Sequence, residues 1–333
     1  MPAIDERAHP GPARRRALRG LAAGACALAL PATAQSRYPA RPIEFVVAFG
    51  AGGTSDIYYR GLCGLLSRFL GQSLVVLNKP GAGSAVGSAY LKRATPDGYT
   101  IGNLTEVLMR EQLLGADLYD PKTDFTYIGA GATVPFGWAV KAESPIRSLA
   151  QMVEIGRKSP EKLTYGAAGS AKLPSWAMKV LEHQTGAKYL GIPYPSSAAI
   201  VVALLSDQID IICDAPGALA ATVSGGRVRM LAISSEQRLA QWPDVPTARE
   251  LGIDATTTLP YGVGGPAKMP AEVVAVIEDA LRKAIETPEH QQLVNKLNMA
   301  PWVRVGKAYD TYMQTQYAAM PALMQSFGVL PAR

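Results

Sequence analysis

Cysteine and histidine are scarce in this chain, which has three of each among 333 residues. It contains no His-Glu-x-x-His, Cys-x-x-Cys or Gly-x-Ser-x-Gly motif and no Gly-Lys-Ser/Thr phosphate-binding loop. The common zinc hydrolase, dithiol, serine hydrolase and P-loop sites therefore lack their residues. We predict that the protein is not an enzyme and needs no cofactor or metal.

The scarce residues fall within predicted secondary structure. His183 and His290 lie on predicted helices, where we expect surface residues rather than bases. Cys63 lies in a predicted helix and Cys213 in an apolar strand, which favours buried thiols. A disulfide between them is the alternative in an oxidising compartment, because sequence does not give their distance.

The apolar run near the start of the chain is too short to span a membrane, which takes roughly 20 residues. The first 34 residues instead have the pattern of a cleavable export signal. Arg14, Arg15, Arg16 and Arg19 form a basic start, an Ala/Leu run follows, and Ala32-Thr33-Ala34 offers a cleavage site. We predict a periplasmic protein beginning near Gln35. The arginines also resemble a twin-arginine signal, so the export route, Sec or twin-arginine, stays open.

Concentrated positive charge is also lacking once this leader is set apart. The whole chain has a net charge of +6, but residues 1–34 carry five of its Lys/Arg and two of its Asp/Glu. The remainder has a net charge of +3 and no Lys/Arg cluster with interleaved aromatic residues. We therefore expect no nucleic-acid partner.

What the sequence does contain is an alternation of short apolar runs and helical patterns. Strand 42–49 is followed by helix 54–70, strand 73–77, helix 84–94 and strand 99–104. The alternation recurs in the second half of the chain. It predicts an α/β fold in which mostly parallel sheets are flanked by helices.

Two such units joined by extended crossings predict two lobes with a ligand cleft between them. We assign residues 35–137 and 260–333 to the first lobe and residues 138–259 to the second. In open α/β sheets, ligands collect at the carboxyl ends of the strands. The Gly50, Gly169 and Asp214 segments all lie at such ends, so one site could use all three.

The loop Gly50-Ala51-Gly52-Gly53, which leads into a helix near Thr54, is the main candidate site. Glycines let the backbone approach a bound group, and the free N–H groups of a first helical turn favour an anion. A nucleotide phosphate is the alternative to a carboxylate, because Gly81–Gly87 also has dinucleotide-like glycines. Such patterns are weak signals, and nicotinamide cofactors are scarce outside the cytoplasm.

Two acids, Asp56 and Asp214, each follow an apolar strand or its loop. As a pair they could order water or bind a ligand amine. The structural alternatives are helix capping for Asp56 and a loop-fixing hydrogen bond for Asp214. We expect a mainly structural role for Asp56 and keep Asp214 among the candidate ligand residues.

Five spaced motifs resemble the Bug family, the periplasmic substrate-binding proteins of tripartite tricarboxylate transporters. The resemblance covers essentially the whole mature chain. The motifs are Tyr38-Pro39-Ala40-Arg41-Pro42-Ile43, Ala51-Gly52-Gly53-Thr54-Ser55-Asp56, Asn78-Lys79-Pro80-Gly81-Ala82-Gly83, Pro96-Asp97-Gly98-Tyr99-Thr100 and Pro243-Asp244-Val245-Pro246-Thr247.

The resemblance implies a two-lobed, periplasmic-binding-protein-like fold that closes on a small carboxylic acid. Two facing loops would hold the carboxylate through backbone N–H groups and small hydroxyls, with Asp214 nearby. The implied ligand-binding residues are Ala51, Gly52, Gly53 and Thr54 in the first lobe and Ala168, Gly169, Ser170 and Ala171 in the second. The implied partners are membrane transporter subunits or a sensor, and we expect a monomer.

The sequence departs from the family pattern in the second lobe. Family members often carry His in the segment matched here by Pro174-Ser175-Trp176, and Arg-Gly where Pro195-Ser196-Ser197 follows Tyr194. Losing a basic residue and gaining Trp176 suits a less charged or aromatic acid, which we keep as a hypothesis. The alternatives to uptake are a sensor subunit that presents the ligand to a partner, and a periplasmic α/β enzyme that uses Asp56 or Asp214.

Overall fold

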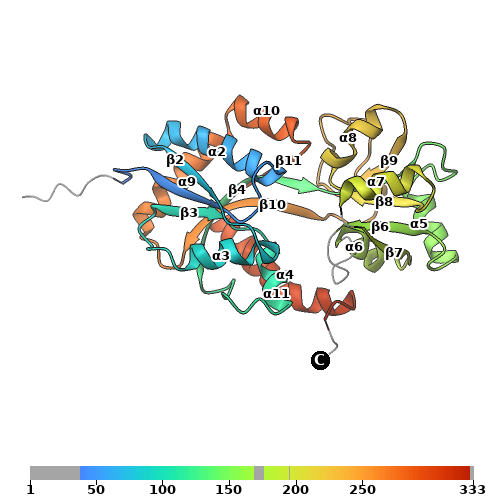
Figure 1. Cartoon of the computed structure of the whole chain (residues 1–333), viewed down its shortest axis with the longest axis horizontal. Helices are drawn as coiled ribbons and strands as arrows, with labels where there is room; N and C mark the ends of the chain where they lie inside the picture. Colours follow the sequence, from blue (N-terminus) through green and yellow to red (C-terminus); the bar gives the residue numbers. More distant parts are fainter. Residues whose placement is uncertain (1–37, 169–175, 195, 331–333) are drawn as a thin grey trace, which may run out of the picture. The chain divides into compact units, whose positions relative to one another are not determined.

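The computed structural model describes residues 38–168, 176–194 and 196–330. Its helices and strands lie in the compact unit Arg41–Arg333 and build two β-sheets flanked by helices (Figure 1). This arrangement confirms the predicted two-lobed α/β fold class. No helix among the described residues is long and apolar enough to cross a membrane.

The first sheet has six strands. In spatial order they are β11 (Ala300–Val305), β4 (Phe125–Pro135), β10 (Thr258–Pro266), β3 (Thr100–Asn103), β1 (Ile43–Val47) and β2 (Leu74–Asn78). The second sheet has five strands. In spatial order they are β7 (Leu190–Tyr194), β6 (Thr164–Ala168), β8 (Ile211–Asp214), β5 (Gly137–Lys141) and β9 (Val228–Ile233).

Both sheets are mixed, which corrects the expectation of mostly parallel sheets. Only β1 with β2 and β3, and β6 with β7 and β8, pair in parallel; the remaining strand pairs of both sheets are antiparallel. The reason is the crossing between the sheets. β4 leaves the first sheet and continues through Phe136 into β5, and β10 returns beside β4, so the two must run in opposite directions.

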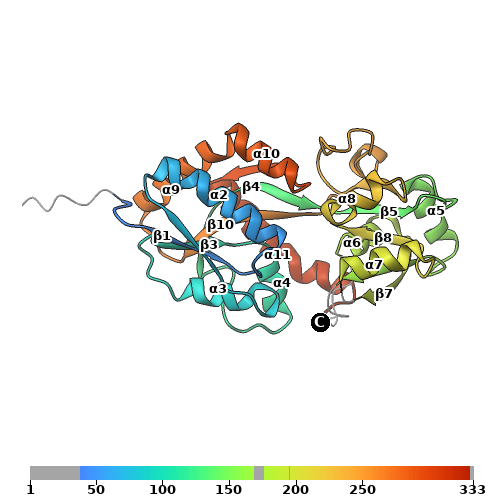
Figure 2. The same cartoon turned by 45° about the horizontal axis from the view of Figure 1, so that its top comes forward.

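Helices cover both faces of each sheet (Figures 1 and 2). Those of the first lobe are α2 (Thr54–Leu70), α3 (Ala85–Lys92), α4 (Val107–Leu113), α9 (Ala271–Ile285), α10 (Pro288–Lys296) and α11 (Lys307–Ser326). Those of the second are α5 (Leu149–Lys158), α6 (Trp176–Thr185), α7 (Ser197–Leu205) and α8 (Pro216–Ser224). Two short 3₁₀ segments are η2 (Ala82–Ser84) and η3 (Arg249–Leu251).

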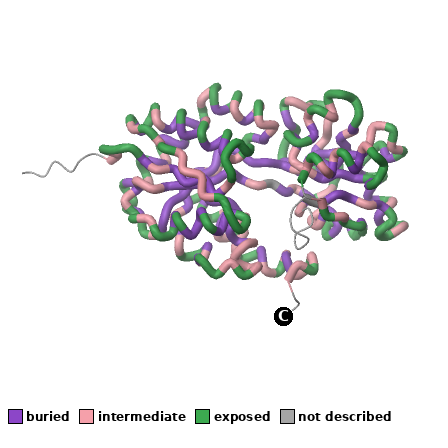
Figure 3. The backbone as a smooth tube through the Cα atoms, in the orientation of Figure 1, coloured by how far each residue is buried: buried purple, intermediate pink, exposed green. Residues whose placement is uncertain are grey.

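Buried residues concentrate along the inner strands of both sheets (Figure 3). On one face of the second sheet, Trp138 packs with Leu149 of α5 and Leu181 of α6. On the other face, Ile212 packs with Ile200 of α7. Layers of this kind are the stable way to bury one face of a sheet and one stripe of a helix.

Helix α2 shows how the local sequence sets one such layer. Tyr58, Leu62 and Leu66 recur at a helical spacing and are fully buried. The helix ends at Gly71, which adopts the left-handed conformation that glycine accepts most readily. Buried packing on one side and a fixed end thus hold the amino-terminus of α2 in place.

Three elements were not foreseen from the sequence. Helix α4 and the first half of the long strand β4 lie in the segment 105–130, for which the sequence predicted a looser structure, and β11 lies between the predicted helices 288–297 and 307–326. The expectation for the cysteines is confirmed. Cys63 in α2 and Cys213 in β8 are both buried, and no disulfide joins them.

Candidate functional site

The loop between β1 and α2 leaves the amino-terminus of this long helix exposed to solvent. Ala51, Gly52, Gly53 and Thr54 are all exposed. Gly52 has a φ of 79°, and Gly53 is the extended N-cap residue with no side-chain cap bond. The first N–H groups of an α-helix have no intrahelical acceptor, and the helix dipole places partial positive charge there. This loop is therefore ready to bind an anion.

The side chain of Asp56 stabilises the conformation of this loop. Its buried carboxylate accepts hydrogen bonds from the Gly52 N–H (2.9 Å), Arg60 Nε (3.0 Å) and Asn78 Nδ2 (2.8 Å). The Arg60 guanidinium, the Gly52 N–H and the Asn78 amide lower the pKa of Asp56 to about 2. All of these donors belong to the protein, so Asp56 has the structural role expected for it.

Two asparagines that sequence reasoning did not select fix the end of β1. Asn78 Nδ2 donates to the Phe49 carbonyl oxygen (3.1 Å), and Asn103 Oδ1 accepts from the Ala48 N–H (2.6 Å). Both residues end strands that flank β1 in parallel. Polar residues at the carboxyl ends of neighbouring parallel strands are the signal that would have found them.

An aromatic layer supports the first turns of α2 from a distant part of the chain. Ser55 Oγ donates to Tyr261 Oη (2.9 Å), and the Tyr261 ring stacks on Tyr59 with centroids 5.5 Å apart. Tyr58 Oη lies 3.1 Å from His290 Nε2. These contacts pack aromatic side chains against the first turns of α2.

The two histidines that were predicted to lie on the surface differ in their burial. His183 is exposed, as expected, whereas the expectation of a surface position for His290 is wrong. His290 is only 3% exposed because α10 packs it against Tyr58. Burial lowers the pKa of His290 to about 4, which keeps the imidazole neutral near pH 7.

The predicted second loop lies mostly outside the described residues. Ala168 is the last residue of β6 and pairs with Tyr194 of β7, but Gly169, Ser170 and Ala171 fall in the segment that is not described. Their predicted contact with a ligand therefore stays a prediction.

Asp214 ends β8 at the same edge of the sheet as Ala168 ends β6, because β6 and β8 are parallel. Its Oδ1 accepts from the Ala215 N–H (2.7 Å). Its Oδ2 is buried and has no hydrogen-bond partner among the described residues. Burial raises the pKa of Asp214, while the Ser197 hydroxyl and the Ala215 N–H act in the opposite direction. The Ser197 hydroxyl and the Ala215 N–H are thus the donors beside this carboxylate.

Trp176, the unusual residue at the start of α6, is engaged by the protein itself. Its ring packs edge-on against Phe327 (centroids 4.9 Å apart), and the Arg110 guanidinium lies 5.1 Å from the ring centroid. A cation over an aromatic face is a favourable contact. These contacts use the ring that the aromatic-acid hypothesis assigned to a ligand, and so they weaken that hypothesis.

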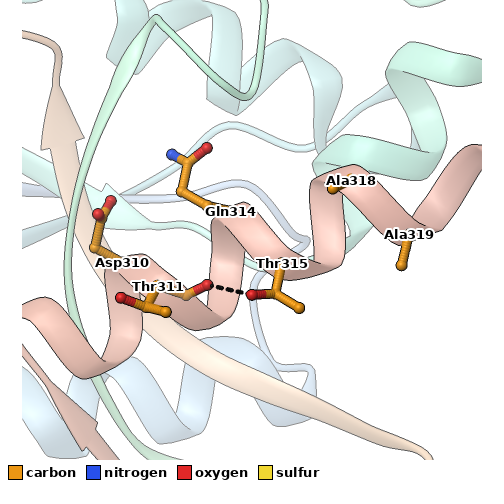
Figure 4. A pocket seen from close by; sticks show the side chains of 6 residues that line it. All are labelled: Asp310, Thr311, Gln314, Thr315, Ala318 and Ala319. Atoms are coloured by element: carbon orange, nitrogen blue, oxygen red, sulfur yellow. Dashed lines mark hydrogen bonds between the residues drawn. The ribbon is translucent and has the colours of Figure 1, made fainter.

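A separate hollow lies along one side of α11 (Figure 4). Its lining consists of Asp310, Thr311, Gln314, Thr315, Ala318 and Ala319. A carboxylate and no cation face this space, which disfavours an anion there. Elsewhere among the described residues, no three His, Cys, Asp or Glu side chains are grouped to hold a metal ion.

Comparison with known proteins identifies relatives over nearly the full chain. The model of the TctC family, described as tripartite tricarboxylate transporter family receptor, matches residues 59–329. The UPF0065 protein in the gbd 5' region of Cupriavidus necator is 33% identical over 318 residues, which cover 94% of this chain and 97% of that protein.

Two solved structures are similar to this chain in their fold. A TctC solute binding protein from Polaromonas, solved with no ligand, has a TM-score of 0.78 and 28% identity; the match covers 86% of this chain and 99% of that one. The periplasmic binding protein BugD has a TM-score of 0.66 and 27% identity, with 88% of this chain and 99% of that one covered. These relatives are binding proteins rather than enzymes.

Proposed function

Because this chain belongs to the TctC family of tripartite tricarboxylate transporter receptors, we propose that it is an exported, monomeric receptor for a small carboxylic acid. It delivers the acid to the membrane subunits of such a transporter. The single observation that supports this best is the open amino-terminus of α2 at Gly50–Thr54. Its glycines allow close approach, and its N–H groups favour an anion without a buried Lys or Arg.

The proposed site lies between the two lobes at the carboxyl ends of their strands. Ala51, Gly52, Gly53 and Thr54 contribute from the first lobe. The segment Ala168–Ala171 and Asp214 contribute from the second. Closure of the lobes, residues 35–137 with 260–333 against 138–259, would exclude water and strengthen the hydrogen bonds to the carboxylate.

Export is supported by the leader pattern and by the periplasmic binding protein BugD among the similar structures. Purification from the periplasm followed by intact-mass measurement tests it. We expect a mature chain that begins near Gln35, together with any acid carried through purification. A mass that retains the leader would contradict cleavage.

The variant Gly53→Asp tests the α2 loop directly. Asp is a favoured N-cap residue, Gly53 already has an extended backbone, and an added Cβ would make only an ordinary 3.6 Å contact with the Gly50 carbonyl oxygen. The fold should therefore persist. The new negative charge should weaken binding of any carboxylate by about tenfold or more in isothermal titration calorimetry.

Gly53→Asn is the matched control, because it offers a similar cap without the charge. We expect it to weaken binding much less than Gly53→Asp. Equal affinity of the wild type and Gly53→Asp for the bound acid would refute the α2 loop as the carboxylate site.

A further inference from the structure

One buried serine lies beside both crossings between the lobes. β4 ends at Pro135 in the first sheet and β5 begins at Gly137 in the second, so Phe136 is the single residue between them. On the return crossing, Thr257 directly precedes β10. Ser234 follows the last residue of β9 in the second lobe and is fully buried. Its hydrogen bonds therefore bear on how the chain passes from lobe to lobe.

Four hydrogen bonds join Ser234 to the two crossings. Its N–H donates to the Phe136 carbonyl oxygen (2.8 Å), and its carbonyl oxygen accepts from the Thr257 N–H (3.1 Å). Its hydroxyl accepts from the Phe136 N–H (2.8 Å) and donates to the Thr257 carbonyl oxygen. A hydroxyl can do both at once, because it has one donor and two acceptor lone pairs. Among the described residues, no other side chain forms hydrogen bonds with both crossings.

The Ser234 hydroxyl extends the pairing of β4 with β10 beyond the end of the first sheet. These strands pair antiparallel as far as Pro135, which lies opposite Thr258. One further step along the ladder sets Phe136 opposite Thr257. At this step the Phe136 N–H is connected to the Thr257 carbonyl oxygen through the serine hydroxyl. The two crossings are thus linked by one side chain at the boundary between the lobes.

Phe136 and Thr257 lie outside the strands, and the hinges of two-lobed proteins are a few such loop or element-terminal residues that absorb changes in φ and ψ. We propose that the Ser234 hydroxyl is the hinge link of this receptor. It holds the two crossings together and so limits the rotation of one lobe against the other. This inference goes beyond the proposed function, because it concerns how the lobes move and not what they bind.

The variant Ser234→Ala tests the link by double electron–electron resonance. It removes the hydroxyl and keeps both backbone hydrogen bonds of residue 234. Nitroxide labels at Gln292→Cys in α10 and Ala221→Cys in α8 report the interlobe distance, because both positions are exposed and belong to different lobes. The native thiols of Cys63 and Cys213 are buried, so the reagent should label the introduced cysteines.

The expected result is a broader distribution of interlobe distances in the unliganded Ser234→Ala variant. The fraction of distances outside the main wild-type range should rise about fivefold, the ratio that corresponds to one net hydrogen bond between the crossings. No ligand is needed for this measurement. The inference can therefore fail while the proposed function stands, and a failure to bind any acid would leave the inference untouched.

Ser67→Ala is the matched control. The hydroxyl of Ser67 in α2 has the same two uses within one lobe: it donates to the Cys63 carbonyl oxygen (2.8 Å) and accepts from the Leu74 N–H (3.2 Å). Its loss should lower the melting temperature, as the loss of the Ser234 hydroxyl does. It should leave the interlobe distances unchanged, because both of its partners belong to the first lobe.

Ser234→Cys provides a second variant, because a thiol is a weak donor and a weak acceptor of similar shape. It should broaden the distances less than Ser234→Ala does, and it takes the place of Ser234→Ala if the alanine variant does not fold. An unchanged distance distribution in the alanine variant, or in the cysteine variant that replaces it, would overturn the inference. Equal broadening in Ser67→Ala would overturn it as well, since the effect would then be a general loss of stability.

Discussion

Asp56 and Asp214 occupy comparable places in the two lobes and are used in opposite ways. Asp56 lies in the first turn of α2, the helix that follows β1, and Asp214 is the last residue of β8. Asp56 is surrounded by three donors and its pKa falls to about 2. Asp214 has the Ala215 N–H and the Ser197 hydroxyl as donors, and burial raises its pKa. In one lobe hydrogen bonds therefore dominate the environment of the aspartate, and in the other lobe burial does.

The difference lies in what the neighbouring elements carry. Arg60 stands one helical turn after Asp56, and Asn78 ends the adjacent strand β2. Asp214 pairs with Gly137 of β5, which has no side chain, and its donors are the Ser197 hydroxyl and the Ala215 N–H. Three strong donors hold the Asp56 carboxylate ionised, whereas at Asp214 burial outweighs the two donors and favours the protonated form.

The largest expected contrast is in stability at pH 7. Asp56→Ala removes three charge-assisted hydrogen bonds beneath the α2 loop, and we expect it to lower the free energy of unfolding by about 3 kcal/mol. Asp214→Ala removes a poorly solvated carboxylate with two internal donors, and should cost under about 1 kcal/mol. Urea unfolding of both variants measures the difference. Similar losses of unfolding free energy in the two variants would contradict the difference described between Asp56 and Asp214.

The pH dependence of stability should show opposite signs for the two acids. The folded pKa of Asp56, about 2, lies below the ordinary value of 3.8. The contribution of Asp56 to the free energy of unfolding is therefore fully present above pH 4. It amounts to about 2 kcal/mol and is lost as the pH falls through 2. The raised pKa of Asp214 works the other way: its contribution is largest at low pH and is lost as the pH rises above 3.8.

Asp56→Asn and Asp214→Asn separate these two contributions. Urea unfolding between pH 2 and pH 6 should give a flatter acid limb for Asp56→Asn than for the wild type. Asp214→Asn should give a steeper rise of stability with pH above 3.8 than the wild type, because the opposing contribution of Asp214 is removed. An unchanged acid limb in Asp56→Asn would show that Asp56 is not the group responsible.

A smaller effect is expected at Gly52, whose N–H is one of the donors to Asp56. Its φ of 79° is left-handed, although a Cβ there would meet nothing within 4 Å. Gly52→Ala should therefore cost about 1 kcal/mol through backbone strain alone. Gly50→Ala is the control, since Gly50 has the same open space and no positive φ. Equal melting temperatures for the two variants would contradict this explanation.

Part of this site could be predicted from the sequence. The glycine loop, the helix start at Thr54 and the strand that ends at Asp214 are all local patterns, and the structure has them where expected. The partners could not be predicted in the same way. Tyr261 reaches Ser55 across 206 positions of the chain, and Asn103 reaches Ala48 across 55. No local pattern encodes such contacts.

The sheets show the same limit. The alternation of strands and helices indicated an α/β fold with two lobes, but it also suggested mostly parallel sheets. β4 and β10 pair antiparallel because each crosses between the lobes in its own direction. Strand direction within a mixed sheet follows from these crossings, which a pattern of apolar residues does not record.

The sequence by itself determined the family, the order of the elements and the loop that opens the helix for an anion. These rest on spacing along the chain, where glycines, small hydroxyls and apolar periods act within a few residues of one another. Only the tertiary structure decided that Asp56 accepts three hydrogen bonds, that His290 is buried and that burial raises the pKa of Asp214. Those properties depend on which donors and which apolar surfaces the fold brings to each side chain.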